Sequence, residues 1–373
     1  MIEIYWFIVI AVILMGLVLP QQGPNRKYYV IVMAVIHAFV CGFRYQYLTG
    51  DLQAYHNMYE TMPYFGWFSD EVIQEGKNTG FYMFMKLIAM LTNSNYQMFL
   101  LVVAIIIETA VAILIYRYSP RPWLSYLVWN CVGFYIFGFS AVKQSLSMAF
   151  VVFAMICIFE NKLLRFILCV IIAGLIHAPA FAFLPAYWLA KRRINMWMIG
   201  LYILAAGVIF LFRDRIVVFV SEYYYEEATM ELLQFGTEGL GGRFFMIVLV
   251  LICGALLKGF REKEFESLFH IIVISAIFQM FSVYNNVFTR FADYYFQFSI
   301  LFIPLIFYPA VHQERTNKSY MRAMLPFNDR SITFLVICLT VVLLWYYQYT
   351  CLGVPVANPI DDYLNFRFMW DVN

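Results

Sequence analysis

Residues 96–115 read YQMFLLVVAIIIETAVAILI, an apolar run that contains one charged residue, Glu108. A helix of this length rises about 1.5 Å per residue and crosses roughly 30 Å of hydrocarbon. Similar apolar runs occupy Ile4–Leu19 near the start of the chain and Ile332–Tyr346 near its end. This recurrence predicts a protein that crosses a membrane several times.

The composition of the 373 residues supports the same prediction. Hydrophobic residues make up 63% of the chain and charged residues 13%, and the mean hydropathy is +0.74. Because an average soluble domain is nearer half apolar and a quarter charged, this composition excludes a soluble enzyme or binding module. We expect one transmembrane domain over residues 1–373, and no nucleic acid among its partners.

The first apolar run is predicted to remain in the protein as a helix. It carries Glu3 where a signal peptide has basic residues, and no small-x-small cleavage site precedes Pro20. The cysteines lie mostly within apolar stretches at no metal-like spacing, so we expect them to be packing residues.

Basic residues cluster in alternate loops between the apolar runs, and this pattern predicts the topology. Six such loops hold 16 of the 25 Lys and Arg residues but only 6 of the 23 acidic residues. By the positive-inside rule, we expect these six loops in the cytoplasm. The clusters are Arg26–Lys27, Arg117–Arg121, Lys162–Arg165, Lys191–Arg193, Lys258–Lys263 and Arg315–Arg330.

Two segments cannot be ordinary crossings in this topology. Gly80–Leu91 is only roughly 18 Å long as a helix and carries Lys86, so we expect an interfacial or re-entrant helix on the outer side. Leu163–Ala190 must cross outward and return, because basic loops flank both of its ends. Its break is expected at His177-Ala178-Pro179, since proline removes a backbone donor and disfavours helix in the residue before it.

The sequence thus predicts an all-α polytopic membrane protein with both termini outside. It would contain about ten full transmembrane helices, the broken helix pair and the outer re-entrant helix. The expected outer segments are loops at about 45–78 and 213–242 and a tail at about 351–373.

Costly polar residues that are scattered along the chain converge on the outer rim in this topology. The cations there are suited to bind a phosphate or pyrophosphate on a lipid. The carboxylates and the histidine are suited to orient a sugar hydroxyl or to accept its proton. Aromatic residues suit the faces of sugars. The set comprises Arg44, Asp51, Tyr55, Glu75, Lys143, Gln144, His177, Arg243, Arg290, Asp293 and Tyr294.

Each of these residues also has a structural interpretation. Arg44 at a helix end is placed to snorkel to the headgroups, and Asp51 or Asp293 to form a turn or a helix cap. His177 beside a proline break suits a structural histidine. Lys143 is harder to explain in this way, because a cation in the first turn of a helix opposes the helix dipole. With an anion bound there, the dipole, the free N–H groups and the ammonium would act together.

Glu108 is a separate case. An ionisable residue at mid-membrane depth is a functional candidate by default, and a neutral, hydrogen-bonded packing role is the alternative.

The order of several short motifs resembles the EpsG family, the Wzy-like polymerases of bacterial exopolysaccharide and capsule synthesis. The motifs, spread over residues 43–295, are Phe43-Arg44, Gly50-Asp51, Tyr55, Glu75, Gly80-Phe81, Lys143-Gln144, His177-Ala178-Pro179-Ala180, Leu184-Pro185, Arg290 and Tyr294. Two positions depart from the family pattern. An arginine usually stands where Lys143 is, so the charge is kept and bidentate geometry is lost. A serine is common where Pro179 is.

The resemblance implies a GT-C-like fold and a substrate class. The substrates would be oligosaccharide repeat units on undecaprenyl pyrophosphate, joined by glycosyl transfer at the outer face of the bacterial plasma membrane. The implied partners are membrane lipid, a flippase, a chain-length regulator and an initiating transferase.

The resemblance also implies roles for the converging residues. Arg44, Lys143 and Arg290, with Gln144 and Arg243 beside them, would bind the pyrophosphate. Tyr55, Asp293 and Tyr294 would contact sugar. His177 is expected to be the general base, with Asp51 as its rival. No cofactor is required, although Asp51 and Glu75 have the chemistry to hold a divalent ion.

Two other functions compete with a polymerase. A membrane acyltransferase would share the buried His177 and the outer location, but it would not need three cations for a pyrophosphate, and its thioester donor would have to be reached from the cytoplasm. A lipid-linked oligosaccharide flippase would be expected to show repeated halves and polar residues at the midplane. The absence of an internal repeat argues against the flippase, and Glu108 argues for it.

Overall fold

The computed structural model describes residues 3–73, 78–212, 215–216, 218, 241–258, 263–283, 287–307, 329–352 and 366–371. The regular elements in these ranges are 17 α-helices with short 3-10 and π-helical turns. The β interaction recorded in the same ranges is an isolated antiparallel bridge between Arg44 and Phe368. The all-α prediction is confirmed.

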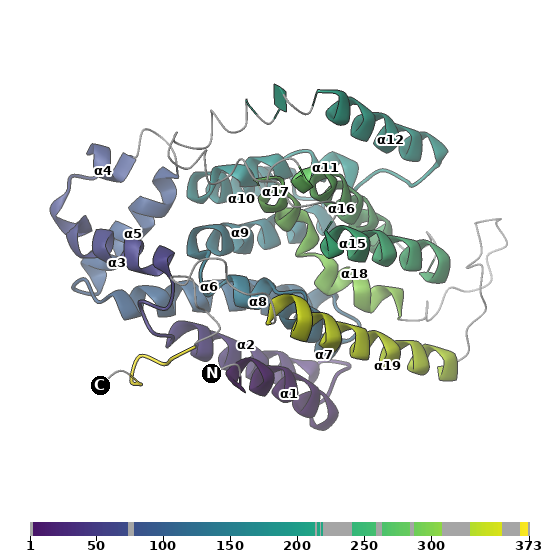
Figure 1. Cartoon of the computed structure of the whole chain (residues 1–373), viewed down its shortest axis with the longest axis horizontal. Coiled ribbons are helices and arrows are strands. Elements are labelled where there is room, and N and C mark those ends of the chain that lie inside the picture. Colours follow the sequence, from purple (N-terminus) through teal and green to yellow (C-terminus); the bar gives the residue numbers. More distant parts are fainter. Residues whose placement is uncertain are drawn as a thin grey trace.

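Helices α3 (Gly50–Thr61), α4 (Asp70–Ile73) and α5 (Thr79–Leu91) gather at one end of a helical bundle, which we call the α3 end (Figure 1). The other helices are α1 (Glu3–Val18), α2 (Arg26–Gly42), α6 (Tyr96–Tyr118), α7 (Pro122–Cys131), α8 (Phe134–Phe137), α9 (Val142–Phe159), α10 (Leu163–Ile176), α11 (Ala186–Leu189), α12 (Met196–Leu211), α15 (Gly242–Cys253), α16 (Lys263–Met280), α17 (Val287–Phe296), α18 (Ser299–Ile306) and α19 (Asp329–Tyr346).

Three helical segments in the described residues are long and apolar enough to cross a membrane. They are Tyr96–Tyr118, Val142–Phe159 and Lys263–Val283. Several shorter apolar helices accompany them, because local breaks divide other apolar runs. For example, Gly133 takes a φ of 96° between α7 and α8, a conformation that glycine adopts without strain. The described residues therefore fit a polytopic membrane protein, with fewer long spans than the ten expected.

The predicted break at His177 is confirmed. Helix α10 ends at Ile176, and His177 is extended, with φ −148° and ψ 106°. A 3-10 helix, η3 (Ala178–Phe183), follows and carries Pro179 near its start, where the missing N–H is tolerated. Segment η3 packs back against α10, as expected for a pair that reverses direction.

Helix α5 is the segment that the sequence marked as interfacial or re-entrant. It packs against α3, α4, α6 and α10 at the α3 end. Lys86, which is 2% exposed, donates to the carbonyl oxygens of Met62, Pro63 and Phe65 at 3.0, 3.3 and 2.7 Å. Lys86 is therefore the residue that ties α5 to the segment that follows α3.

Loops that were predicted to share one side of the membrane meet at the opposite end of the bundle. Arg26 donates to the Ser119 carbonyl oxygen at 3.1 Å. The Glu160 carboxylate pairs with Arg117 at 2.7 Å and with Lys162 at 2.5 Å. Three of the six basic loops are thus in contact, which agrees with the predicted grouping.

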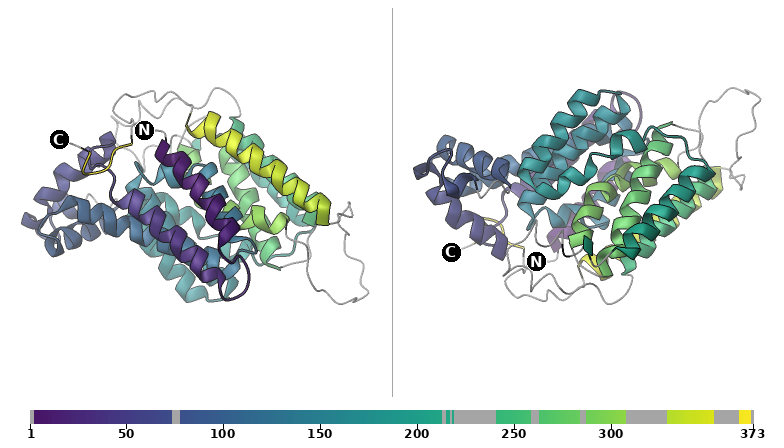
Figure 2. Two further views of the ribbon diagram at one scale, coloured as in Figure 1. Left: turned by 90° about the horizontal axis from the view of Figure 1, so that it is seen from below. Right: turned by 90° about the horizontal axis from the view of Figure 1, so that it is seen from above.

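The segment 366–371 lies beside the end of α2. Tyr45 donates its N–H to the Arg367 carbonyl oxygen at 2.8 Å, and Met369 donates to that of Phe43 at 3.0 Å. Both termini of the chain lie toward the α3 end (Figure 2). Almost all of the expected outer loop at 213–242 lies outside the described residues.

Candidate functional site

The first turn of α9 places Lys143 among aromatic rings at the α3 end. Its Nζ lies 5.6, 5.5 and 5.1 Å from the ring centroids of Tyr55, Phe81 and Tyr82. It also donates to the Tyr82 hydroxyl at 3.3 Å. Cation–π attraction offsets part of the cost of withdrawing the half-buried ammonium from water. Tyr55 thus takes part in a cage around a cation.

Two other charged residues lie within electrostatic range of Lys143, namely Asp51 and Arg290. Asp51 is exposed in the first turn of α3, and Arg290 is half-buried in α17. The site therefore brings together two cations and one carboxylate from three different helices.

His177 stands next to this charged group, at the break between α10 and η3. Its Nδ1 lies 2.7 Å from the Tyr294 hydroxyl, and its ring is 8% exposed. Burial lowers the pKa of His177 well below its usual value, and the positive charges of Arg290 and Lys143 lower the pKa further. The imidazole is therefore neutral at physiological pH and able to accept a proton.

Asp293 is held in a network that joins three helices. Its carboxylate forms an ion pair with Arg243 of α15 and accepts a hydrogen bond from Gln144 Nε2 of α9 at 3.2 Å. Gln144 Nε2 also approaches the Arg290 carbonyl oxygen at 3.5 Å. Asp293 is 4% exposed, so this network is better suited to fixing α17 than to contacting a sugar.

Arg44 does not join the cage. Its guanidinium is 1% exposed, and Nη1 donates to the Cys41 carbonyl oxygen and contacts the Cys41 sulfur at 3.2 Å. The Arg44 Nε and Nη2 have no hydrogen-bond partner within the described residues. Glu75, the other candidate carboxylate, lies outside those residues.

Local sequence features dock α5 onto the break at His177. Gly80 lies against Leu175, and a Cβ at Gly80 would come within 3.0 Å of the Leu175 backbone. Asn78, with a φ of 55°, accepts a hydrogen bond through Oδ1 from the Ala178 N–H at 3.2 Å. The Gly80-Phe81 motif thus provides both the close approach and one ring of the cage.

The sequence interpretation missed Ser147 and Tyr82. Ser147 of α9 contacts the Tyr294 hydroxyl at 3.0 Å, and Tyr82 contacts Lys143. The spacing of Lys143 and Ser147 is i, i+4, which puts both on one face of α9. The same spacing relates Arg290 to Tyr294 on α17. These spacings are the signal that identifies a buried polar layer one turn below the cations.

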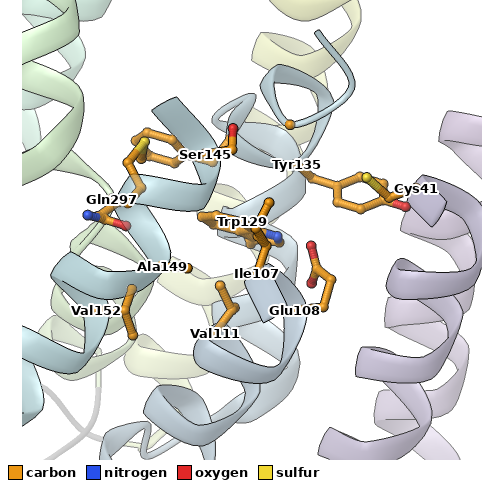
Figure 3. A pocket seen from close by; sticks show the side chains of 13 residues that line it. Cys41, Ile107, Glu108, Val111, Trp129, Tyr135, Ser145, Ala149, Val152 and Gln297 are labelled. Atoms are coloured by element: carbon orange, nitrogen blue, oxygen red, sulfur yellow. The ribbon is translucent and has the colours of Figure 1, made fainter. Parts of the chain in front are cut away.

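A small, mostly apolar cavity lies deeper in the bundle and includes Glu108 (Figure 3). Glu108 lies between Trp129 and Cys41, with Ser145 and Gln297 also on the cavity wall. Glu108 Oε2, Trp129 Nε1, Ser145 Oγ and Gln297 Oε1 have no hydrogen-bond partner within the described residues. This lining contains no second ionisable carboxylate or basic residue, and Lys143 and His177 do not belong to it.

A metal site is not evident in the part of the chain that the structure describes, which has no group of three or more His, Cys, Asp and Glu side chains suited to one. The groups that are present are two cations, a carboxylate and a neutral imidazole. They can bind an anion and remove a proton from a neighbouring hydroxyl group.

Comparison with known proteins gave one result. The family model described as EpsG family matches residues 27–354. Comparison with curated proteins and with solved structures gave no match.

Proposed function

This chain belongs to the EpsG family, and from that premise we propose that it is a polysaccharide polymerase of exopolysaccharide or capsule synthesis. It would join oligosaccharide repeat units carried on undecaprenyl pyrophosphate at the outer face of the bacterial plasma membrane. In this proposal, the α3 end faces outward, which agrees with the grouping of basic loops at the opposite end.

The observation that carries the proposal is the position of Lys143 and Arg290 beside the neutral His177. A lipid pyrophosphate is a multiply charged leaving group, so cations fixed near it stabilise the charge that develops as it departs. An acceptor sugar hydroxyl needs a base at the same place, and a histidine can act as that base only while it is unprotonated.

In the proposed reaction, the acceptor hydroxyl at the non-reducing end of an incoming unit attacks the anomeric carbon of the growing glycan. His177 takes the hydroxyl proton as the new C–O bond forms. The bond from the anomeric carbon to the pyrophosphate oxygen breaks, and the lipid pyrophosphate leaves with both bonding electrons. Lys143 and Arg290 bind the departing anion.

The remaining site residues receive supporting roles. The Tyr55, Phe81 and Tyr82 rings that hold Lys143 are placed to pack against sugar or prenyl groups as well. The Arg243–Asp293 ion pair and Gln144 fix α17, and so fix the position of Arg290. Asp51 stays the rival base, because it is exposed near Lys143. The flippase, chain-length regulator and initiating transferase of such a pathway are proposed partners.

The test is reconstitution of the purified protein in lipid with a lipid-pyrophosphate-linked repeat unit, followed by separation of the products by size. We expect a ladder of glycans from the wild type, and ladder formation that is slower by at least about 100-fold from Lys143→Met, Arg290→Gln or His177→Asn. Asp51→Asn tests the rival base.

The chain offers matched controls for two of these variants. Lys191→Met removes a lysine that also lies over an aromatic ring, that of Tyr187 at 3.7 Å, in one of the basic loops. His270→Asn removes a buried histidine whose Nδ1 is also bonded to a tyrosine hydroxyl, that of Tyr202. Both controls should retain the ladder. If no ladder forms but the labelled lipid moves to the other leaflet, the chain is a transporter and the polymerase proposal is wrong.

A further inference from the structure

We propose that Tyr294 and Ser147 are positioning residues that hold His177 as the tautomer with its proton on Nδ1, so that Nε2 is the atom that accepts a proton. The assignment of the tautomer stands on geometry alone. Its use in catalysis rests on the function proposed above.

The basis is a chain of three hydrogen bonds that begins at His177. His177 Nδ1 lies 2.7 Å from the Tyr294 hydroxyl, which lies 3.0 Å from the Ser147 hydroxyl. Ser147 Oγ in turn lies 2.7 Å from the carbonyl oxygen of Ala173. The chain thus ends on the backbone of α10, one turn before the histidine itself.

The last bond sets the direction of all the others. A carbonyl oxygen only accepts, so the single hydroxyl proton of Ser147 must point at Ala173. Ser147 can then only accept in its contact with Tyr294, so the phenol proton of Tyr294 points at Ser147. Tyr294 has no second proton, and the contact with His177 therefore requires an N–H at Nδ1.

A neutral imidazole carries one proton. With that proton on Nδ1, the lone pair is on Nε2. The described residues offer no hydrogen-bond partner to Nε2, whereas Nδ1 is fully engaged. A base whose tautomer is fixed in advance presents its lone pair without a prior proton shift.

Burial shields the hydrogen-bond chain from water. Ser147 and Tyr294 are both 0% exposed, and they come from α9 and α17, which are separate helices. Bulk water is therefore kept from both hydroxyl groups. Each lies four residues after a cation of the site, Lys143 on α9 and Arg290 on α17, so the cations and the hydrogen-bond chain are fixed by the same two helices.

Removal of the Ser147 hydroxyl and removal of the Tyr294 hydroxyl should change the His177 tautomer in different ways. Ser147→Ala takes away the acceptor of the Tyr294 proton and frees that proton to point at His177. His177 Nδ1 then becomes an acceptor, and the imidazole proton moves to Nε2. Tyr294→Phe instead removes the acceptor of Nδ1–H, so that neither tautomer is favoured by a hydrogen bond.

The experiment is ¹⁵N–¹H correlation spectroscopy of histidine-labelled full-length protein in lipid nanodiscs, with His177→Asn used to identify the His177 signals. We expect a protonated Nδ1 in the wild type, a protonated Nε2 in Ser147→Ala and a mixture in Tyr294→Phe. A protonated Nε2 in the wild type would overturn the proposal, and so would a Ser147→Ala spectrum that is unchanged from wild type.

Matched controls separate the tautomer from loss of packing. Ser275→Ala removes another buried serine that donates to a carbonyl oxygen, that of Ala292 at 3.1 Å, and Tyr202→Phe removes the hydroxyl beside His270. Both should leave the His177 signals unchanged. A change of His177 tautomer in either control would show that general loosening moves the proton, which contradicts the specific role of Ser147 and Tyr294.

Activity is a second measurement. In the ladder assay, Ser147→Ala should lower kcat on the order of 10²-fold with little change in KM, because the base is present but carries its proton on the wrong atom. A loss confined to KM would contradict the positioning role. The spectroscopic result does not depend on any ladder, so failure of the polymerase proposal and failure of this one are distinguishable.

Discussion

Lys143 Nζ and Tyr82 Oη lie 3.3 Å apart, and this contact joins the first turn of α9 to α5. Helix α5 also supplies Phe81 to the cage, and it packs against α10 just before His177. Helix α5, which is too short to be an ordinary membrane crossing, is therefore the helix that shapes the site around Lys143.

Lys143→Arg is expected to keep most of the polymerisation rate, whereas Lys143→Met should lower it by at least about 100-fold. The charge is what binds the pyrophosphate, and a guanidinium stacks on aromatic rings as well as an ammonium does. Initial rates of ladder formation measure the difference. Equal losses in both variants would indicate that the shape of the lysine, not its charge, is needed.

Gly80→Ala should weaken the site without touching any charged group. A Cβ at Gly80 would press on the Leu175 backbone at 3.0 Å, so α5 must move and the Tyr82 and Phe81 rings move with it. We expect a rate loss of about tenfold and reduced thermal stability in nanodiscs, since overpacking typically costs about 1–3 kcal/mol. Gly66→Ala is the control, because its nearest neighbours lie 4.0 Å away. Wild-type behaviour of Gly80→Ala would contradict the close packing.

The pH dependence of kcat/KM should report the neutral state of His177. Its pKa is lowered, so the unprotonated base predominates down to pH 6.5 and the rate should fall only below that value. Arg290→Gln removes one of the positive charges that lower the pKa, so the acidic fall in rate should move to higher pH. An acidic limb that does not move would show that His177 is not the titrating group, and Asp51→Asn would then be examined in the same way.

The Arg243–Asp293 pair should be a stabilising contact for α17. Breaking a fully buried ion pair costs roughly 3–5 kcal/mol. Because the Arg243 side chain keeps 24% exposure, we expect about 2 kcal/mol for Asp293→Asn, measured by denaturant titration in mixed micelles. In a double-mutant cycle with Arg243→Met, most of this loss should disappear. Additive losses would mean that the two residues act independently.

Glu108→Gln should leave ladder formation within about twofold of wild type. The amide keeps the volume and hydrogen-bonding capacity of a carboxyl group, and Glu108 lines a different cavity from the cage. A transporter that uses an acidic residue at mid-membrane depth would instead lose its activity. The same reconstituted vesicles distinguish these outcomes by ladder formation and by lipid movement between leaflets.

Much of the architecture could be predicted from the sequence because it depends on local signals. Proline after His177 marks the break in a long apolar segment, and the length of Gly80–Leu91 marks a helix too short to cross. The alternation of basic loops predicts which ends meet. Together, these signals were sufficient to predict that Lys143, His177 and Arg290 lie in one region.

The directions of side chains could not be predicted in this way. Arg44 follows a helix end just as a snorkelling arginine would, yet its guanidinium turns inward to Cys41. Tyrosine is a residue type suited to sugar binding, but Tyr294 is 0% exposed and hydrogen-bonded to His177. Arg44 turns to a residue three positions before it, and Tyr294 contacts one that lies 117 positions away. An apolar pattern carries no information about either contact.

The antiparallel bridge between Arg44 and Phe368 has a consequence for biosynthesis. The end of α2 is made early, whereas Arg367 and Met369, the backbone partners of Tyr45 and Phe43, are made only after α19. The surroundings of Arg44 are therefore completed only after α19 has been made. A stop codon that removes residues 366–371 would leave Phe43, Arg44 and Tyr45 without these backbone partners.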